Sequence, residues 1–286
     1  MPRTQNFNIR QSMKRDTFEV FHYRDARMQK VELHHHIFYE VYYFLSGEVD
    51  YNIEGKIYKL QPHDLLFISP TELHQPLVDP NTPYERIVLW INRGYLNSLS
   101  SPLADLTQCF NIKHLEHNNL VRPTLNQIKL LDMRFEQLTN ETQRPSFGSE
   151  IYSTGLFMQF MVELNRMFIQ TEVAELPVND ASPLIKEVLS FIDNNFSVED
   201  ISLASVAERF FISKYHLSRQ FNSALGISLY KYITLKRMQK ASIMLSNGQA
   251  PSQVSLDCGY NDYSNFYRAF LTEYGISPSE YAKRCI

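Results

Sequence analysis

Three histidines and one glutamate in the N-terminal part of the chain have side chains that could do chemistry together. His34, His36 and Glu40 fall in one short stretch, and His74 follows further along the sequence. Imidazole and carboxylate groups together suit iron, manganese, nickel or zinc, so one interpretation is a divalent metal site in a metal-dependent enzyme. In the other, the same four side chains line a pocket for an organic ligand or only pack the interior. We expect the pocket, with no metal cofactor and no enzymatic activity.

The single tryptophan, Trp90, is a fifth candidate for this pocket. It lies in the segment YERIVLWIN, whose composition is typical of a strand. A flat aromatic side chain beside polar His and Glu side chains suits one face of a sugar ring. We therefore expect a sugar or a similar small molecule as the ligand. The alternative is that Trp90 fills the interior, as buried aromatic side chains commonly do.

Short strands must position these side chains. From Glu32 to Asn92 the chain runs in short segments rich in Tyr, Phe, Ile and Val, and in one of them Val49, Tyr51 and Ile53 alternate with polar residues. Turn signals separate the segments at Ser46-Gly47, Glu54-Gly55, Gln61-Pro62, Ser69-Pro70 and Asn81-Thr82-Pro83. Such regular spacing favours an antiparallel barrel or sandwich.

A segment that occurs twice in the C-terminal part carries a second kind of chemistry. Residues 213–233 are SKYHLSRQFNSALGISLYKYI and residues 262–282 are DYSNFYRAFLTEYGISPSEYA, at a constant offset of 49. The first residue of each copy, a serine or an aspartate, is a good helix N-cap because its side-chain oxygen accepts free backbone N–H groups. Gly226 and Gly275 stand where a helix ends in a left-handed residue. Each copy therefore predicts one short helix with defined ends.

The two sides of each predicted helix differ. Leu217 and Phe221 in the first copy, and Phe266 and Phe270 in the second, form apolar stripes at a spacing of four. The other sides carry Arg, Tyr, Ser and Lys, which suit phosphates and base edges, and Arg can make two hydrogen bonds to guanine. A single copy would fit an ordinary polar surface equally well, but two copies in register favour DNA binding. The expected DNA contacts are Lys214, Tyr215, Ser218 and Arg219 in the first copy, and Tyr263, Ser264, Tyr267 and Arg268 in the second.

Each copy follows another short helical pattern, so the sequence predicts two helix-turn-helix units. The preceding patterns are ISLASVAERFFI at residues 201–212 and PSQVSLDCGYN at residues 251–261. Between the units, one long amphipathic helix is predicted by Leu229, Ile233, Met238, Ala241 and Leu245. Such a spacer would let both recognition helices enter successive major-groove segments on one face of DNA, about 34 Å apart.

These patterns together resemble AraC/XylS-type transcriptional regulators. Residues 182–286 are similar to their double helix-turn-helix domain in SKYHLSRQF, Cys258-Gly259-Tyr260, Phe266-Tyr267-Arg268-Ala269-Phe270 and Gly275-Ile276-Ser277-Pro278. The resemblance implies base contacts at the Tyr, Ser and Arg positions given above, and RNA polymerase as a further partner. Asn222 and Leu271 stand where many members carry Lys, which leaves phosphate contacts at those two positions unassigned.

The N-terminal part resembles the cupin barrel with which many of these regulators sense effectors. The first cupin pattern, His-x-His, three residues, an acid, six residues and Gly, is met by His34, His36, Glu40 and Gly47. A second cupin pattern is met only partly, because His63 replaces its usual Gly. The resemblance implies a small-molecule effector bound inside the barrel.

Two helical patterns follow the barrel. Residues 122–143 and 147–170 carry apolar residues at helical spacing, and the second pattern is apolar over more than one face. It must therefore pack on the barrel, and we expect it to pack on a second copy as well. A helix pair of this kind commonly dimerises in the family, so we expect a homodimer. Residues 171–181 contain Pro177, Asn179 and Asp180 and are predicted to be the interdomain linker.

The expected fold class is α+β multidomain, with an N-terminal cupin-like antiparallel β-barrel and helical pair, and a C-terminal all-α domain of two helix-turn-helix units. The predicted divisions are a sensing barrel at 1–121, a dimerisation segment at 122–170, a linker at 171–181 and a DNA-binding domain at 182–286. We expect a ligand-responsive regulator that binds double-stranded DNA sequence-specifically, more commonly an activator in this family. The alternatives are a bifunctional protein with a metal-dependent enzymatic barrel and a regulator whose barrel is only a scaffold.

Charge and composition agree with this expectation. The whole chain has a net charge of −3, whereas residues 182–286 hold 11 Lys and Arg against 9 Asp and Glu, a small excess of the right sign for DNA. Cys109, Cys258 and Cys285 are too few and too scattered for a disulfide framework, which fits a reducing cytosol. The sequence shows neither a signal segment nor an apolar run of about 18 residues, so we expect a cytoplasmic protein without a membrane partner.

Overall fold

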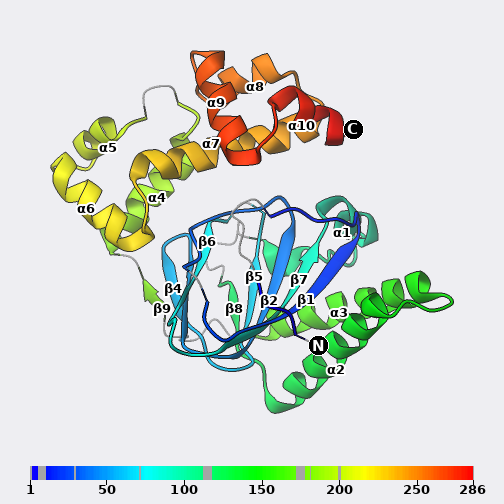
Figure 1. Cartoon of the computed structure of the whole chain (residues 1–286). Coiled ribbons are helices and arrows are strands. Elements are labelled where there is room, and N and C mark those ends of the chain that lie inside the picture. The colour runs from blue at the N-terminus through cyan, green and yellow to red at the C-terminus, as the bar shows by residue number, and fades with distance from the viewer. Residues whose placement is uncertain are drawn as a thin grey trace. The chain divides into compact units, whose positions relative to one another are not determined.

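The computed structural model describes residues 2–5, 11–28, 30–70, 72–111, 118–171, 178–180, 182–198 and 201–285. The chain divides into two compact units, Met1–Asn179 and Asp180–Ile286. The first unit contains two sheets flanked by helices, and the second is built of helices (Figure 1). This confirms the expected fold class. Among the described residues, no helix is long and apolar enough to cross a membrane.

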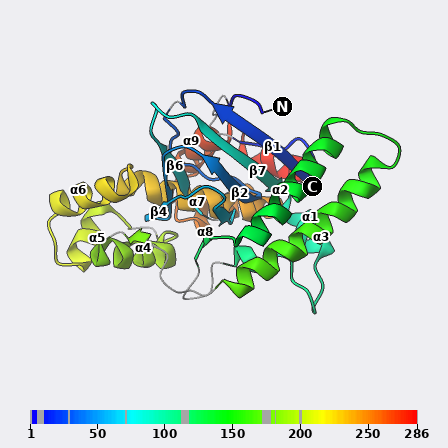
Figure 2. The same ribbon diagram turned by 90° about the horizontal axis from the view of Figure 1, so that it is seen from below.

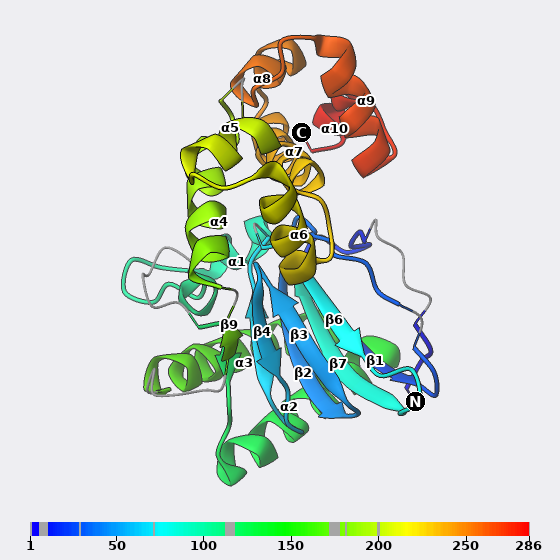
Figure 3. The same ribbon diagram turned by 90° about the vertical axis from the view of Figure 1, so that its left-hand side faces the viewer.

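Two sheets form the first unit, and their ladders among β1 to β8 are antiparallel. The strand orders are β1-β7-β2-β5-β8 and β6-β3-β4-β9. Figure 3 shows the four-stranded sheet. The elements are β1 Phe18–Asp25, β2 Tyr39–Ser46, β3 Val49–Ile53, β4 Lys56–Lys59, β5 Leu65–Ile68, β6 His74–Val78, β7 Tyr84–Ile91, α1 Arg93–Leu99, the 3₁₀ helix η1 Gln108–Phe110, β8 Leu120–Val121 and β9 Val178–Asp180. The sequence predicted strands only from Glu32 onward and so missed β1, which pairs with β7 along its whole length.

The side chains of β2 and β7 alternate between two cores, because successive side chains point to opposite faces of a strand. Val41, Tyr43 and Leu89 face the core on the helical side of the five-stranded sheet. Tyr42 and Trp90 face the core between the two sheets. Because both of their faces are buried, these two strands are largely apolar and lack the polar alternation of a solvent-facing strand, and their polar residues Glu40 and Arg86 are themselves buried.

Two long helices, α2 (Leu125–Gln143) and α3 (Ser149–Gln170), pack on the five-stranded sheet (Figure 2). Phe157 of α3 stacks on Phe18 of β1 with ring centroids 4.5 Å apart. Tyr43 of β2 stacks on a phenylalanine of α2 in the same core. The predicted packing of the second helix on the barrel is therefore confirmed.

The second unit contains α4 Pro183–Asn195, α5 Leu203–Arg209, α6 Lys214–Leu225, α7 Leu229–Ser246, α8 Pro251–Asp257, α9 Tyr263–Tyr274 and α10 Pro278–Cys285. The pairs α5–α6 and α8–α9 are the two helix-turn-helix units, and α7 connects them (Figure 1). The prediction that α7 is amphipathic is wrong, because Tyr232, Leu235 and Gln239 are buried as well as the predicted stripe. The physical reason is that α7 packs against α6 and also against α8, α9 and α10.

Two glycines with left-handed backbone conformations allow a matched test of packing in this unit. Gly248 and Gly259 have φ angles of +81° and +78°. A Cβ at Gly259 would lie 2.6 Å from the Ser197 carbonyl oxygen, whereas a Cβ at Gly248 would meet nothing within 4 Å. We expect Gly248→Ala to lower the free energy of unfolding by about 1 kcal/mol through strain alone. Gly259→Ala should cost about 2 kcal/mol or more, because the backbone must also move.

Urea denaturation of both glycine variants, followed by circular dichroism, measures this difference. Equal losses of stability for Gly248→Ala and Gly259→Ala would contradict the role assigned to the close approach of Ser197.

Candidate functional site

The recognition helices α6 and α9 begin and end where the sequence predicted. The Ser213 hydroxyl and the Asp262 carboxylate each accept backbone N–H groups from the first turn of their helix. The hydrogen bond from the Ser264 backbone N–H is the largest cause that lowers the pKa of Asp262, and the hydrogen bond from the Ser264 side chain is the next. The Asp262 cap is therefore ionised at neutral pH. Gly226 and Gly275 follow the last turns with φ angles of +72° and +74°.

Each recognition helix buries its apolar stripe and exposes its polar side. Leu217 and Phe221 of α6 are fully buried, as are Phe266 and Phe270 of α9. All the side chains predicted to contact DNA are exposed, namely Lys214, Tyr215, Ser218, Arg219, Tyr263, Ser264, Tyr267 and Arg268. Two repeated helices with the same polar face can therefore approach phosphates and base edges.

Arg268 lies along its own helix. Its Nη2 atom donates to Asn265 Oδ1 at 2.7 Å, and its Nε atom donates to the Ser264 carbonyl oxygen at 3.4 Å. Asn265 is exposed and was missed from the sequence. Its position three residues before Arg268 was the available signal, because residues at that spacing share a helix face.

A cavity of about 30 Å³ lies in the barrel, and three of the five predicted ligand residues, His34, Glu40 and Trp90, line it. The other two, His36 and His74, are not part of its wall. This volume is enough for about two water molecules. A sugar ring needs more room, so the cavity must widen before such a ligand can enter.

Arg86 of β7 also lines the cavity and was missed from the sequence. Its side chain is 2% exposed and forms an ion pair with the buried Asp25 of β1. Arg86 also donates a hydrogen bond to Gln5 Oε1. Its guanidinium carbon Cζ lies 4.1 Å from the ring centroid of Tyr84. Asp25 and Arg86 are 61 residues apart, so no local pattern could have paired them. Further lining residues that the sequence did not identify are Gln5, Gln11, Tyr42, Tyr51 and Tyr84.

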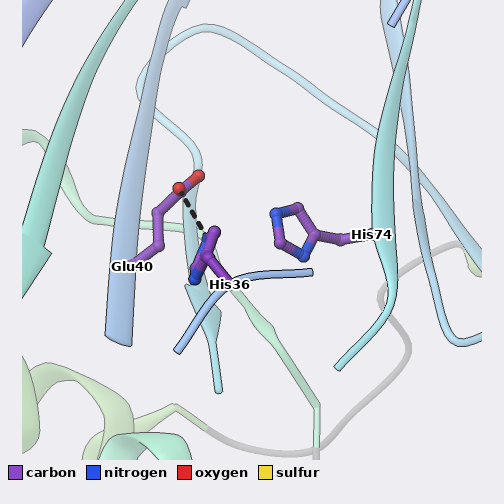
Figure 4. Close-up of side chains that lie close together, drawn as sticks. All are labelled: His36, Glu40 and His74. Carbon is purple, nitrogen blue, oxygen red and sulfur yellow. Dashed lines mark hydrogen bonds and ion pairs between the residues drawn. The ribbon is translucent and has the colours of Figure 1, made fainter. Parts of the chain in front are cut away.

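His36, Glu40 and His74 form a compact buried group beside this cavity (Figure 4). One ligand atom from each of them lies within 4.8 Å of the others, and His36 Nε2 is 3.1 Å from Glu40 Oε2. His34 contacts His74, with ring centroids 4.3 Å apart, but does not belong to the group. Two imidazoles and a carboxylate are donors that suit a divalent transition metal.

Trp90 fixes the carboxylate of this group. The strand register places Trp90 directly opposite Glu40, and its indole Nε1–H donates to Glu40 Oε2 at 2.9 Å. The indole also packs against Phe21 and Phe38, with centroids 4.7 Å apart in each pair. Trp90 therefore positions Glu40 and forms part of the cavity wall, in addition to packing the interior.

Burial keeps His34 and His74 uncharged at neutral pH by lowering their pKa values. The pKa of His34 lies well below 6.5. Burial is the largest cause, and repulsion from protonated His74 and His36 adds to it. Burial, followed by the charge of His36, lowers the pKa of His74 to about 4. Burial acts to raise the pKa of Glu40, but the hydrogen bond and charge of His36 outweigh it, and the pKa is lowered.

We expect the barrel of the metal-free chain to lose stability as the pH falls from about 6.5 to about 4. Above this pH window His74 is neutral in both the folded and the unfolded chain. Inside the window only the unfolded chain binds a proton at His74, so the free energy of unfolding decreases as the pH falls toward the pKa of the folded chain. For His74 the loss is roughly 2–4 kcal/mol. Urea unfolding in EDTA, followed by Trp90 fluorescence, should give a flatter pH profile for His74→Gln than for the natural chain. Identical profiles would show that His74 does not carry this dependence.

Comparison with known proteins assigns a family to both halves. The family described as AraC-like ligand binding domain matches residues 19–161. The family described as helix-turn-helix domain matches residues 206–284. The chain belongs to the AraC family of transcriptional regulators, with an N-terminal ligand-binding domain and a C-terminal DNA-binding domain.

The chain is also similar to individual relatives and solved structures. The HTH-type transcriptional activator RhaS of Escherichia coli O139:H28 is 25% identical over 248 residues, which cover 86% of each chain. RhaS of Enterobacter sp. strain 638 matches to the same extent. Among solved structures, the C-terminal domain of AraT, a response regulator from Geobacillus stearothermophilus, is 33% identical, with a TM-score of 0.36, and the match covers 36% of this chain and 87% of that one. ToxT of Vibrio cholerae with bound unsaturated fatty acid is 14% identical, with a TM-score of 0.40, and the match covers 95% and 97%.

Proposed function

We propose that this AraC-family regulator is a transcriptional activator whose barrel senses a sugar or a similar polyhydroxyl compound. In this proposal α6 and α9 bind two segments of one double-stranded operator, and the chain acts in the cytoplasm as a homodimer together with RNA polymerase. The observation that carries the proposal is the pair of repeated recognition helices in one domain, both with exposed Arg, Tyr and Ser side chains. RhaS is named as an activator, and its match covers 86% of this chain, which supports activation.

The chemistry of the cavity wall supports a neutral, hydroxyl-rich effector. Arg86 is already paired with Asp25, and Glu40 is bonded to His36 and Trp90, so neither side chain is left to pair with a charged organic effector. The other aromatic rings of the cavity wall suit the faces of a sugar ring, and its neutral hydrogen-bonding groups suit the sugar hydroxyls. Gln5 and Gln11 also line the cavity, so we infer that these two side chains move when the effector enters.

A thermal-shift panel of mono- and disaccharides on the full chain tests the effector. A sugar at about 100 times its Kd stabilises by roughly 2.7 kcal/mol, which should raise the midpoint by several degrees. The shift should disappear in His34→Ala and persist in His22→Gln, whose side chain lies on β1 and bonds Glu85. Absence of a shift with every sugar would contradict the proposed effector class.

The outer surface of the helical pair supports the homodimer. Leu125 of α2 is 79% exposed, and Ile151 of α3 is 82% exposed. The other exposed apolar side chains on these helices are Met133, Tyr152, Met158 and Ile169. Apolar side chains gathered on one pair of helices are typical of a protein–protein interface.

We expect Ile151→Asp to convert the homodimer into a monomer, because an interface core does not tolerate an unpaired carboxylate. Sedimentation velocity measures the change in mass. Leu103→Asp is the matched control, since Leu103 is 99% exposed in the same unit but lies outside α2 and α3. A dimer that survives Ile151→Asp, or one that Leu103→Asp disrupts equally, would contradict this interface.

A further inference from the structure

The histidines in and beside the buried group are held in one tautomer by the backbone. The Nδ1–H group of each donates to a carbonyl oxygen, from His34 to Glu32 at 2.8 Å, from His36 to Phe38 at 2.8 Å and from His74 to Glu72 at 3.1 Å. A carbonyl oxygen can only accept, so Nδ1 carries the proton in each ring. In the neutral imidazole, Nε2 therefore carries a lone pair. Imidazoles that ligate metal ions are oriented in the same way.

The group brings polar atoms of three buried side chains together, and one of these atoms has no hydrogen-bond donor among the described residues. His36 Nε2 lies 3.1 Å from Glu40 Oε2, an oxygen that already accepts the indole N–H of Trp90. His74 Nε2 is buried and has no hydrogen-bond partner among the described residues. Burying an acceptor without a partner costs free energy, and a cation between the three side chains would remove that cost.

We propose that His36, Glu40 and His74 bind a divalent transition metal ion inside the barrel. The ligands of the ion are His36 Nε2, His74 Nε2 and one Glu40 oxygen, so all three atoms donate a lone pair to the same ion. A proton shared between His36 and Glu40 would pair only these two side chains and would leave His74 Nε2 without a partner. Two imidazoles and one carboxylate suit zinc, cobalt, nickel, manganese or ferrous iron.

The size of the group fits such an ion after a small movement. The ligand atoms lie within 4.8 Å of one another, all in buried side chains. Ligands of a tetrahedral zinc ion, each about 2.1 Å from the metal, lie about 3.4 Å apart. The side chains must therefore draw together by about an ångström to bind the ion.

The supporting contacts of the group match those of a metal site. Backbone carbonyls orient both imidazoles, and the Trp90 indole N–H orients the carboxylate. Glu40 belongs to the group and also lines the cavity, so the remaining coordination positions of the ion border the cavity. The metal site does not depend on which organic effector the barrel senses, and it stands even if no sugar binds.

Titration of the EDTA-treated, dialysed full chain with Co²⁺ tests the proposal. We expect one ion per chain by elemental analysis, with the visible d–d absorption bands of Co²⁺ bound to nitrogen and oxygen. Bound Co²⁺ should also quench the fluorescence of Trp90, the single tryptophan, whose Nε1 lies 2.9 Å from Glu40. Zn²⁺ should displace the Co²⁺ and restore the fluorescence.

Variants separate the ligands from the rest of the barrel. His74→Gln and Glu40→Gln should lower the Co²⁺ affinity about 100-fold or more, and Trp90→Phe about 10-fold, because it removes only a supporting bond. His22→Gln is the matched control and should bind Co²⁺ normally. The proposal is overturned if the folded natural chain takes up no Co²⁺ and no Zn²⁺, or if His74→Gln, shown to be folded by circular dichroism, binds Co²⁺ as tightly as the control.

Discussion

The double substitution Arg219→Ala/Arg268→Ala should abolish sequence-specific DNA binding while leaving the fold intact. Both side chains are exposed on recognition helices, one in each helix-turn-helix unit. Loss of a two-pronged arginine contact to guanine costs about 1–3 kcal/mol, and well-separated contacts add, so the pair should cost about 2–6 kcal/mol. Neither side chain packs in the core, so thermal stability should change little.

Fluorescence anisotropy with an operator selected from random double-stranded DNA measures this loss. Each single variant should weaken operator binding by roughly 5- to 150-fold and relax preference at one base position. Arg166→Ala is the matched control, because Arg166 is an exposed arginine on α3 in the other unit. If the double variant loses as much affinity for random DNA as for the operator, both residues are phosphate contacts and the assigned base contacts are wrong.

Asp25→Ala should destabilise the barrel by about 3–5 kcal/mol, because it leaves the buried guanidinium of Arg86 without its counter-charge. Asp25 also accepts the backbone N–H of Gln5 at 2.9 Å, so the attachment of Gln5 to β1 should be lost in the same variant. An arginine does not escape the cost by deprotonation. Urea unfolding followed by Trp90 fluorescence reports on this unit.

The double variant Asp25→Ala/Arg86→Met provides the control for that prediction. It removes both charges, so most of the lost stability should return, as when buried ion pairs are replaced by apolar residues. If Asp25→Ala costs less than about 1 kcal/mol, or if Arg86→Met restores nothing, the ion pair does not hold the cavity wall together.

The parts of the structure that the sequence predicted are those that depend on nearby residues. Helix ends in α6 and α9 follow from Ser213, Asp262 and two glycines, which act within a few residues of their own positions. The polar faces of these helices follow from spacing alone. The existence of short antiparallel strands likewise follows from local alternation and turns.

The parts that it missed depend on contacts between distant residues. β1 was not predicted, and its pairing with β7 brings together Asp25 and Arg86. The burial of α7 on several sides could not be read from its own residues, since it depends on the helices that pack around it. The histidine motif predicted four clustered side chains, but only the fold shows that His34 stands outside the group formed by His36, Glu40 and His74.

The measurement that tests the account most directly is the operator affinity of the full chain with and without each sugar of the panel. We expect one sugar to change the operator Kd by at least about 5-fold, the lower range of allosteric coupling, and to leave the affinity for random DNA unchanged. The same sugar should have no effect on His34→Ala. An operator Kd that no sugar changes, in a chain that binds its operator tightly, would contradict a sugar-sensing barrel and leave a DNA-binding regulator whose barrel serves as a scaffold.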